Sequence, residues 1–307
     1  MSIWGNDLNL IYSNPALLNH SMVNQAVLNY CNFVGDINYF NAGTAYSLKD
    51  RGMTAISLQS FNYGAFAGYD EFGNKTRNFN AADYSLNLNY AKPFADSMFN
   101  VGLCLKTIYS QYDTYKSFGN ALDFGVTYHT KQNFVLSLLI KNVGTIWKTY
   151  SNYNVDNSLP NTVQLGMSYK PKHAPFRFFV VYDQLLKWNL KYISPVDTTG
   201  KSASLGSSDT KQDSTGFQKF GKRFGSLADN FMRHINFGAE ILFSKNFVVR
   251  VAYNYRRQVE MTLPDIRGAN GLSFGAELKV KRFSYSYAFS KTAFPGYSNI
   301  IGLAFRW

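Results

Sequence analysis

The stretch Tyr84-Ser85-Leu86-Asn87-Leu88-Asn89-Tyr90 alternates between apolar and polar side chains without exception. Successive side chains of a β-strand point to opposite faces of the sheet. A period of two therefore predicts a strand with one apolar and one polar face, whereas helical spacing accounts for none of this pattern.

The same alternation returns along the whole chain, in runs of about nine to eleven residues, which is the length that a tilted strand needs to cross a bilayer. Thirteen such runs follow residue 40. Single-chain bacterial barrels have an even number of strands, and Ala26–Phe33 supplies a fourteenth. Further clear runs are Val101–Tyr109, Leu122–Tyr128, Val163–Tyr169, Ile235–Phe243, Phe247–Tyr255 and Phe283–Phe289.

The composition excludes a helical membrane protein. Hydrophobic residues make up 46% and aromatic residues 17% of the chain, while charged residues are 16%, against roughly 25% in a typical soluble protein. No apolar run reaches the ~18 residues of a membrane helix. An aromatic, charge-poor chain without continuous hydrophobic stretches fits a membrane β-barrel or a soluble aromatic-rich β-domain.

The linkers between the runs favour the barrel. They alternate between short turns, such as Lys49–Gly52 and Pro171–Pro175, and longer loops. Outer-membrane barrels place short turns in the periplasm and long loops outside, and a soluble sandwich has no reason to sort its loops in this way. We therefore expect residues 26–307 to form an all-β, fourteen-stranded antiparallel barrel in the bacterial outer membrane. The loops expected at the cell surface are residues 61–82, 143–161, 187–230 and 257–270.

Both ends of the chain fit this scheme. The last strand is expected to pair with the first, because closure removes the sheet edges. Its outward-facing residues would be Ile301, Leu303, Phe305 and Trp307, and its lumen-facing residues Gly302, Ala304 and Arg306. A barrel of this width has room inside, so we expect residues 1–25 to form a short plug in the lumen.

Charged residues recur at lumen-facing positions of the predicted strands. A wide barrel needs a hydrated, cross-paired interior or a polar seat for its plug, and a selective pore is the alternative interpretation. The residues concerned are Lys106, Asp123, Glu240, Arg250, Glu277 and Arg306.

No motif in the sequence indicates catalysis. The histidines lack metal-ligand spacing, and neither His-Glu-x-x-His nor Gly-x-Ser-x-Gly occurs. We expect no catalytic residue, no metal and no cofactor, and we interpret Cys31 and Cys104 as free thiols. The net charge of +12 suits an anionic lipid surface such as lipopolysaccharide, but the basic residues are spread along the chain rather than gathered into a nucleic-acid-binding block.

Several segments resemble known outer-membrane barrels. Asn14-Pro15-Ala16 resembles the Asn-Pro-Ala element in the N-terminal hatch of FadL-like barrels. A longer, ordered set resembles the PorQ-like proteins of the type IX secretion system of Bacteroidetes. It covers most of the chain, but not the Ser-rich residues 198–214, and consists of Asp36–Phe40, Asp70–Leu86, Leu105–Tyr128, Lys141–Tyr150, Tyr169–Phe178, Leu185–Tyr192 and Asp229–Glu260.

This resemblance implies a non-enzymatic FadL-like barrel that anchors a soluble, PorZ-like surface protein in an attachment complex with PorU and PorV. The long loops would then form the docking face. Trp and Tyr are favoured at interface hot spots, although packing at the rim explains such aromatics equally well. The candidate contacts are Phe72, Phe79, Trp147, Tyr150, Tyr153 and Trp188.

An alternative function is a FadL-like outer-membrane channel for hydrophobic small molecules. Such a channel needs an apolar pocket in the lumen and a lateral opening. The lumen positions of the predicted strands are polar or small, which counts against this alternative.

Overall fold

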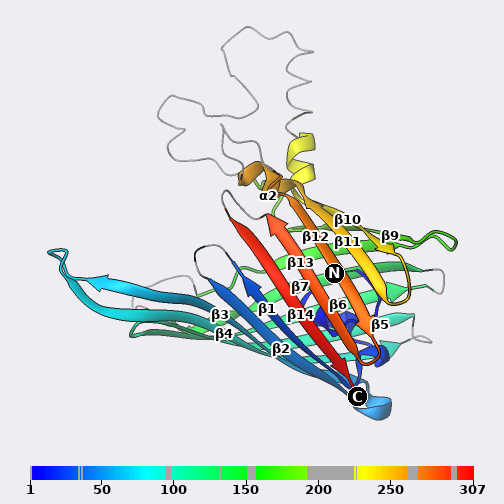
Figure 1. The fold of residues 1–307 in the computed structure, drawn as a ribbon, viewed down its shortest axis with the longest axis horizontal. Coiled ribbons are helices and arrows are strands. Elements are labelled where there is room, and N and C mark those ends of the chain that lie inside the picture. The colour runs from blue at the N-terminus through cyan, green and yellow to red at the C-terminus, as the bar shows by residue number, and fades with distance from the viewer. Residues whose placement is uncertain are drawn as a thin grey trace, which may run out of the picture.

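The computed structural model describes residues 2–33, 35, 37–94, 98–130, 133–150, 157–191, 225, 227–261, 269–291 and 296–307. Fourteen antiparallel strands form a closed barrel in which each strand pairs with its neighbours in sequence and β1 pairs with β14 (Figure 1). The predicted strand number and closure are therefore confirmed. The strands are β1 Gln25–Asn32, β2 Asn38–Ser47, β3 Met53–Tyr69, β4 Lys75–Phe94, β5 Phe99–Tyr112, β6 Tyr115–His129, β7 Phe134–Lys148, β8 Thr162–Tyr169, β9 Phe176–Tyr182, β10 Ile235–Leu242, β11 Phe247–Asn254, β12 Leu272–Val280, β13 Phe283–Lys291 and β14 Tyr297–Arg306.

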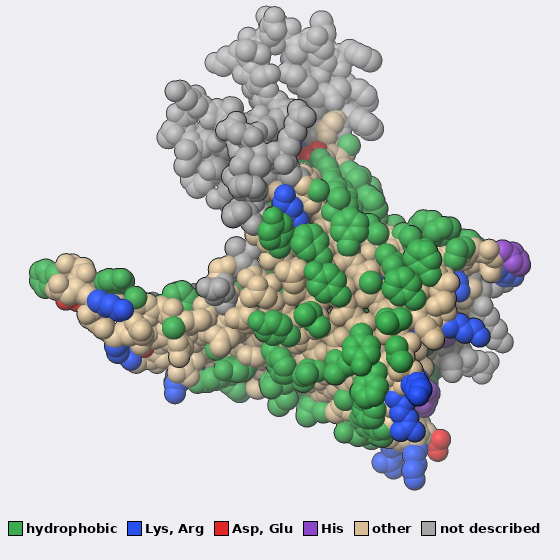
Figure 2. Space-filling view, viewed as in Figure 1, with side chains coloured by type: hydrophobic (Ala, Val, Ile, Leu, Met, Phe, Trp, Pro, Cys, Tyr) green, Lys and Arg blue, Asp and Glu red, His purple; other side chains and the backbone are tan. Residues whose placement is uncertain are grey.

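The period of two separates the faces of the wall as the sequence predicts. Leu86 and Leu88 are 44% and 47% exposed, whereas Asn87 and Asn89 are buried. Exposed apolar side chains cover the outer face (Figure 2), as a barrel surrounded by lipid requires. In β14, Ile301 and Trp307 are exposed and Ala304 is buried, in agreement with the expected facing of the last strand.

The two ends of the barrel differ in their connections. One end, called here the turn end, carries the short turns β2–β3, β4–β5, β6–β7, β8–β9, β10–β11 and β12–β13. The other end, called the loop end, carries the remaining connections. Register places the start of β1 beside the end of β14, with Gln25 opposite Arg306, at the turn end.

The expected loop 61–82 is wrong, because most of it is paired strand. β3 and β4 form a hairpin that projects well beyond the barrel wall (Figure 1). Register shifts between Asn62 and Ala65 and between Ala67 and Tyr69 interrupt the regular pairing. Backbone ladder bonds need no apolar alternation, and bulges absorb the irregular spacing.

The other expected loops differ from the prediction at their ends, or contain helix, where the structure describes them. β7 continues to Lys148, so it takes over the start of the loop 143–161. In the loop 187–230, residues 227–233 are helical. The loop 257–270 starts within the helix α2, which spans Tyr255–Glu260. Residues 151–156, 192–224, 226 and 262–268 lie outside the described residues.

The N-terminal segment, residues 2–24, precedes the barrel wall and packs against its inner face (Figure 1). It forms three short 3-10 helices, η1 Leu8–Tyr12, η2 Pro15–Leu17 and η3 His20–Met22. The side chains of Asp7, Asn14 and Asn19 cap them in turn by accepting hydrogen bonds from the backbone. Among the described helices, none is long and apolar enough to cross a membrane.

Apolar packing ties this segment to the first strands. Leu8, Leu18 and Met22 are fully buried, and they belong to one cluster with wall residues that include Val27, Ala45, Met53, Ala55, Ala91 and Ala304. Small wall residues opposite large N-terminal ones let the segment approach the sheet closely.

Candidate functional site

The interior near the turn end is built around the Asn14-Pro15-Ala16 element. All three residues are buried. A Cβ added at Gly102 of β5 would overlap the backbone of Pro15 and Ala16, and one added at Gly125 of β6 would overlap the Asn14 side chain. These two glycines therefore make room for the N-terminal segment at its point of closest approach to the wall.

Hydrogen bonds from the wall hold the same element. The amide of Asn100 on β5 donates to the carbonyls of Ala16 at 2.7 Å and Leu18 at 2.8 Å. Within the element, Asn14 Oδ1 accepts from the backbone N–H of Ala16 at 2.9 Å. Lys141 of β7 donates to the carbonyl of Tyr12 at 3.3 Å. Side chains of two strands thus satisfy backbone carbonyls of the N-terminal segment.

A chain of ion pairs crosses the inner wall beside the N-terminal segment. Arg250 of β11 pairs with Glu240 of β10 and Glu277 of β12, each at 2.7 Å. Arg177 of β9 pairs with Glu240 at 2.7 Å, and Lys279 pairs with Glu277 at 3.2 Å. Lys279 also donates to Asn6 Oδ1 at 2.9 Å. The lumen-facing charges are therefore cross-paired and contact the segment, and Lys106 and Asp123 form a further pair at 2.7 Å.

The interior near the loop end is lined differently. Aromatic side chains from neighbouring strands form a continuous series on the inner face, called here the aromatic arc. The ring of Phe61 lies 6.3 Å from Phe33, 4.6 Å from Tyr39 and 6.5 Å from Tyr63, measured between centroids. Tyr63 continues the arc to Tyr112 at 5.8 Å, and Tyr112 meets Tyr150 edge-on at 5.3 Å.

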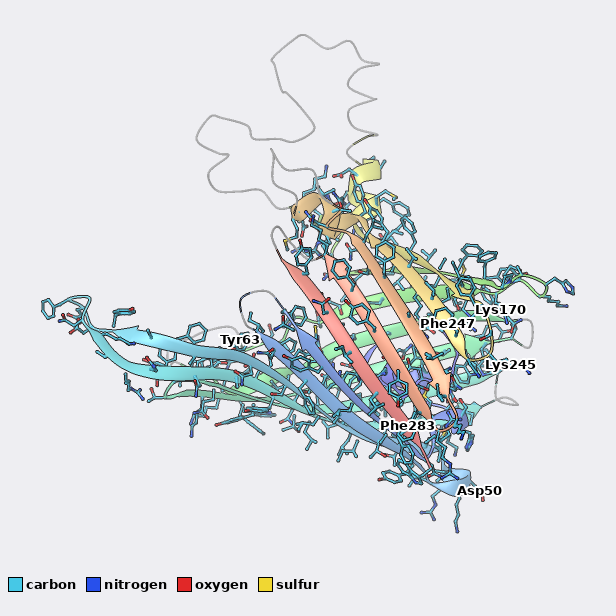
Figure 3. The ribbon with its side chains drawn as sticks, in the orientation of Figure 1. Asp50, Tyr63, Lys170, Lys245, Phe247 and Phe283 are labelled. Atoms are coloured by element: carbon cyan, nitrogen blue, oxygen red, sulfur yellow. The ribbon has the colours of Figure 1, made fainter. Side chains whose placement is uncertain are left out.

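A single carboxylate fixes two rings of the arc. Asp83 Oδ2 on β4 accepts hydrogen bonds from the hydroxyls of Tyr63 at 2.7 Å and Tyr112 at 3.0 Å. Because β4 lies between β3 and β5, this carboxylate joins rings from the two flanking strands. Tyr63 lies at the base of the projecting hairpin (Figure 3). The other oxygen, Asp83 Oδ1, is buried and has no hydrogen-bond partner among the described groups.

The predicted contact residues that the structure describes lie on several different elements. Tyr150 joins the aromatic arc. Trp147 is 70% exposed and donates from Nε1 to Asn120 Oδ1 at 3.0 Å. Trp188 stacks on His234, whose ring also lies within hydrogen-bond distance of the Trp188 carbonyl. Tyr153 lies outside the described residues.

Phe72 and Phe79 lie on the projecting hairpin. Phe72 is 88% exposed in its turn, and Phe79 stacks on Phe66 at 5.4 Å. The carboxylate of Asp70 shapes the turn by accepting from the backbone and side chain of Asn74 and from the backbone N–H of Phe72. These hydrogen bonds, those from Asn74 first, lower the pKa of Asp70. The hairpin thus has a hydrogen-bonded turn that presents the ring of Phe72 among polar residues.

Sequence reasoning missed most of the arc. Phe61 and Tyr63 continue the period of two from Ala55 and Ser57, so they face inward. The third strand was predicted to end before Phe61. The expectation of polar or small lumen positions therefore did not cover Phe61 and Tyr63. Extending that alternation by three residues would have found both rings, but not their neighbours on other strands.

The described residues contain no group of three or more His, Cys, Asp or Glu side chains that could hold a metal ion. Cys31 and Cys104 are buried free thiols, as predicted.

No protein-family model and no curated protein sequence matches the chain. Among solved structures, the fold resembles two variants of TodX, a monoaromatic hydrocarbon channel. The variant lacking S2 and S3 has a TM-score of 0.54 at 11% identity, over 100% of this chain and 96% of that one. The variant lacking S2 has a TM-score of 0.52 at 11% identity, over 99% and 93%. A Pseudomonas aeruginosa FadL homologue aligns with a TM-score of 0.48 at 9% identity, over 99% and 94%. At these identities, the TodX variants show that this chain has the fold of an outer-membrane channel.

Proposed function

We propose that this protein is an outer-membrane channel that takes up small hydrophobic molecules, with aromatic compounds as the preferred class. The aromatic arc is the observation that carries the proposal. Rings arranged side by side on an inner wall offer faces and edges on which another ring can stack, and such pairs are worth about 0.5–1.5 kcal/mol beyond the area they bury.

The orientation follows from the rule for outer-membrane barrels. Short turns face the periplasm and longer connections face outside, so the arc would line the extracellular mouth. A molecule entering from outside would meet the rings of Phe33, Phe61 and Tyr63 before it reached the N-terminal segment.

The N-terminal segment would serve as the plug of this channel. Its hydrogen bonds to Asn100 and Lys141 and its contacts at Gly102 and Gly125 support this role. A segment bound by polar contacts as well as apolar packing can block water while the arc above it binds a ligand. Deleting residues 2–22 should therefore raise the permeability of the barrel to small hydrophilic solutes.

Uptake of labelled toluene tests the channel. The gene is expressed in a Gram-negative host whose own channels for hydrophobic compounds have been deleted. We expect faster uptake with the wild-type chain than with an empty vector, and a several-fold loss in Phe61→Ala. Tyr109→Ala is the matched control, because Tyr109 lies on β5 near Tyr112 but pairs on the outer face with Tyr84, at 6.4 Å.

Equal uptake by Phe61→Ala and the wild type would mean that the aromatic arc does not contribute to uptake. Uptake no faster than with the empty vector, at equal levels of folded barrel, would overturn the channel itself.

A second candidate is a PorQ-like anchor of the type IX secretion system, which tethers a PorZ-like soluble surface protein together with PorU and PorV. The projecting β3–β4 hairpin favours it. Tyr69 is 64% exposed and Phe72 88% exposed near the tip, and a stiff hairpin that presents exposed rings suits a protein partner better than a lipid-soluble ligand.

Purification from native outer membranes in mild detergent tests this second candidate. Under it, a soluble surface protein co-purifies in stoichiometric amount and is lost when residues 66–79 are replaced by a two-residue turn. Deleting the Ser-rich residues 198–206 is the control, because they are not part of the resemblance. A barrel recovered without such a partner would leave the channel as the remaining candidate.

A further inference from the structure

An apolar groove crosses the outer face of the wall near the start of the barrel. Its floor consists of three small outward-facing residues, Ala26 on β1 and Ala42 and Thr44 on β2. The register places Ala26 opposite Thr44 and Ala42 opposite Leu28. Small side chains at adjacent positions of two strands leave a depression in an otherwise bulky apolar surface.

Large side chains form the sides of the groove. Phe305 and Leu303 of β14 lie opposite Ala26 and Leu28 on one side. Ile56 and Leu58 of β3 lie opposite Thr44 and Ala42 on the other. The groove has a volume of about 550 Å³. Its lining residues come from neighbouring strands at matching positions of the register.

Basic residues surround the foot of this groove at the turn end. Lys49 and Arg51 lie in the β2–β3 turn and are exposed. Lys281 and Arg282 lie in the β12–β13 turn, next to β14, and are also exposed. Among the described residues, none of the four forms a salt bridge. The acidic residue Asp50 lies between Lys49 and Arg51 in the same turn. Figure 2 shows Lys and Arg side chains at the edge of the apolar face.

A second hollow lies at the same rim. It has a volume of about 330 Å³ and is lined by His20, Ser47, Lys49, Asp50, Gly52, Lys92 and Pro93. Lys92 lies over the ring of Phe94 at 5.8 Å. An amphipathic ligand with an apolar tail and an anionic head matches an apolar groove that lies next to the basic residues of these turns.

The spacing also suits such a ligand. Four residues separate Thr44, at the lower end of the groove, from Leu48, at the start of the turn, which is roughly 13 Å of strand. A glycerophosphate head group spans the gap between the rim and the upper part of the acyl chains. Outward-facing Tyr46, 47% exposed, lies in this gap at the level where aromatic belts occur.

We propose that the groove and the basic rim form a binding site for one anionic phospholipid from the leaflet at the turn end. An acyl chain lies over Ala26, Ala42 and Thr44, and the head-group phosphate is held by Lys49 and Arg51, with Arg282 approaching from the other side. The proposal does not depend on what the lumen transports.

The full-length barrel is purified in detergent, freed of lipid and titrated with palmitoyl-oleoyl phosphatidylglycerol or phosphatidylcholine, and bound lipid is counted by native mass spectrometry. We expect one phosphatidylglycerol to bind at least tenfold more tightly than phosphatidylcholine. The double variant Ala42→Leu/Thr44→Leu fills the groove and should lose this binding. Ala276→Leu is the control, because Ala276 also faces outward but lies on β12, away from the groove.

The head-group contact is tested separately. Lys49→Gln/Arg51→Gln/Arg282→Gln should remove the preference for phosphatidylglycerol over phosphatidylcholine. Lys172→Gln/Lys245→Gln, in the turns after β8 and β10, should keep it (Figure 3 marks Lys245). Heat-modifiable migration on gels verifies that each variant is folded. Unchanged binding in the groove-filled variant, or equal binding of the two lipids by the wild type, would overturn the site.

Discussion

The two ends of the barrel interior are built from the same strands, yet they are filled in different ways. Near the turn end, the inward positions hold Asn100, Gly102 and Gly125, and the chain's own N-terminal segment occupies the space between them. Near the loop end, the inward positions hold Phe61 and Tyr63, and other rings continue the arc.

This difference indicates that the turn end contributes mainly to stability and the loop end mainly to ligand binding. A buried charge chain and a close backbone approach make the turn end depend on exact complementarity, so changes there should cost folding free energy. The rings of the aromatic arc are half-buried and pack mainly against each other, so changes there should weaken ligand binding with little loss of stability. The predictions below test this division, from the largest expected effect to the smallest.

Removing the central cation of the charge chain should have the largest effect. Arg250→Met leaves Glu240 and Glu277 with one basic partner each, and their side chains are 1% and 4% exposed. Breaking a buried ion pair from one side costs about 3–5 kcal/mol. The measurement is urea-induced unfolding in lipid vesicles. A loss below about 1 kcal/mol would mean that water already screens these carboxylates.

Filling the glycine contact should have the next largest effect. Gly102→Val would push the backbone of Pro15 and Ala16 away from β5, and overpacking of this kind costs about 1–3 kcal/mol. Faster cleavage of the N-terminal segment by an added protease would report its displacement. Gly275→Ala on β12 is the control, since a Cβ there meets its nearest neighbour, the Tyr287 carbonyl, at an ordinary 3.5 Å. Equal protection of the N-terminal segment from the protease in both variants would argue against close packing of this segment on β5.

A change within the arc should affect stability less. Tyr63→Phe keeps the ring and removes the hydroxyl that donates to Asp83, which costs about 1 kcal/mol for one hydrogen bond. Toluene uptake should remain near the wild-type level, because the ring face is retained, whereas Phe61→Ala should lose it. If Tyr63→Phe lost uptake as well, the Asp83 carboxylate rather than the ring surface would be the feature that matters.

The smallest effect is expected at the projecting hairpin. Arg77 pairs with Asp113 at 2.6 Å, but the Arg77 side chain is 65% exposed. Exposed ion pairs contribute about 0–1 kcal/mol, so Arg77→Ala should leave the unfolding midpoint almost unchanged. Hydrogen exchange of the hairpin amides would show any local loosening. A shift as large as that of Arg250→Met would contradict the division between the two ends.

The sequence predicted the parts of the fold that rest on local patterning. Alternation in segments such as Tyr84–Tyr90 indicated which side chains face outward, and the strand count and closure followed from general rules for barrels. The charged residues at inward positions were also identified correctly. Their partners were not, because Arg250 and Glu277 are distant in sequence and meet only through the pairing of β11 with β12.

The projecting hairpin and the aromatic arc were not predicted from the alternation of apolar and polar residues. Gly64 and Gly68 interrupt the apolar period, and the sequence was interpreted as a loop although β3 and β4 remain paired there. The contact between Tyr150 and Tyr112 was likewise not predicted. Ring contacts between strands are set by register, which a single strand's sequence does not contain.

By itself, the sequence determined that the chain forms alternating strands with an apolar and a polar face, since the direction of a side chain along a strand depends only on its parity. Tertiary structure decided which inward residues share a depth, and therefore that glycines meet the Asn14-Pro15-Ala16 element at one end while aromatic rings gather at the other. Depth in a barrel depends on the pairing of every strand with its neighbours around the closed circuit, so it is a property of the whole wall.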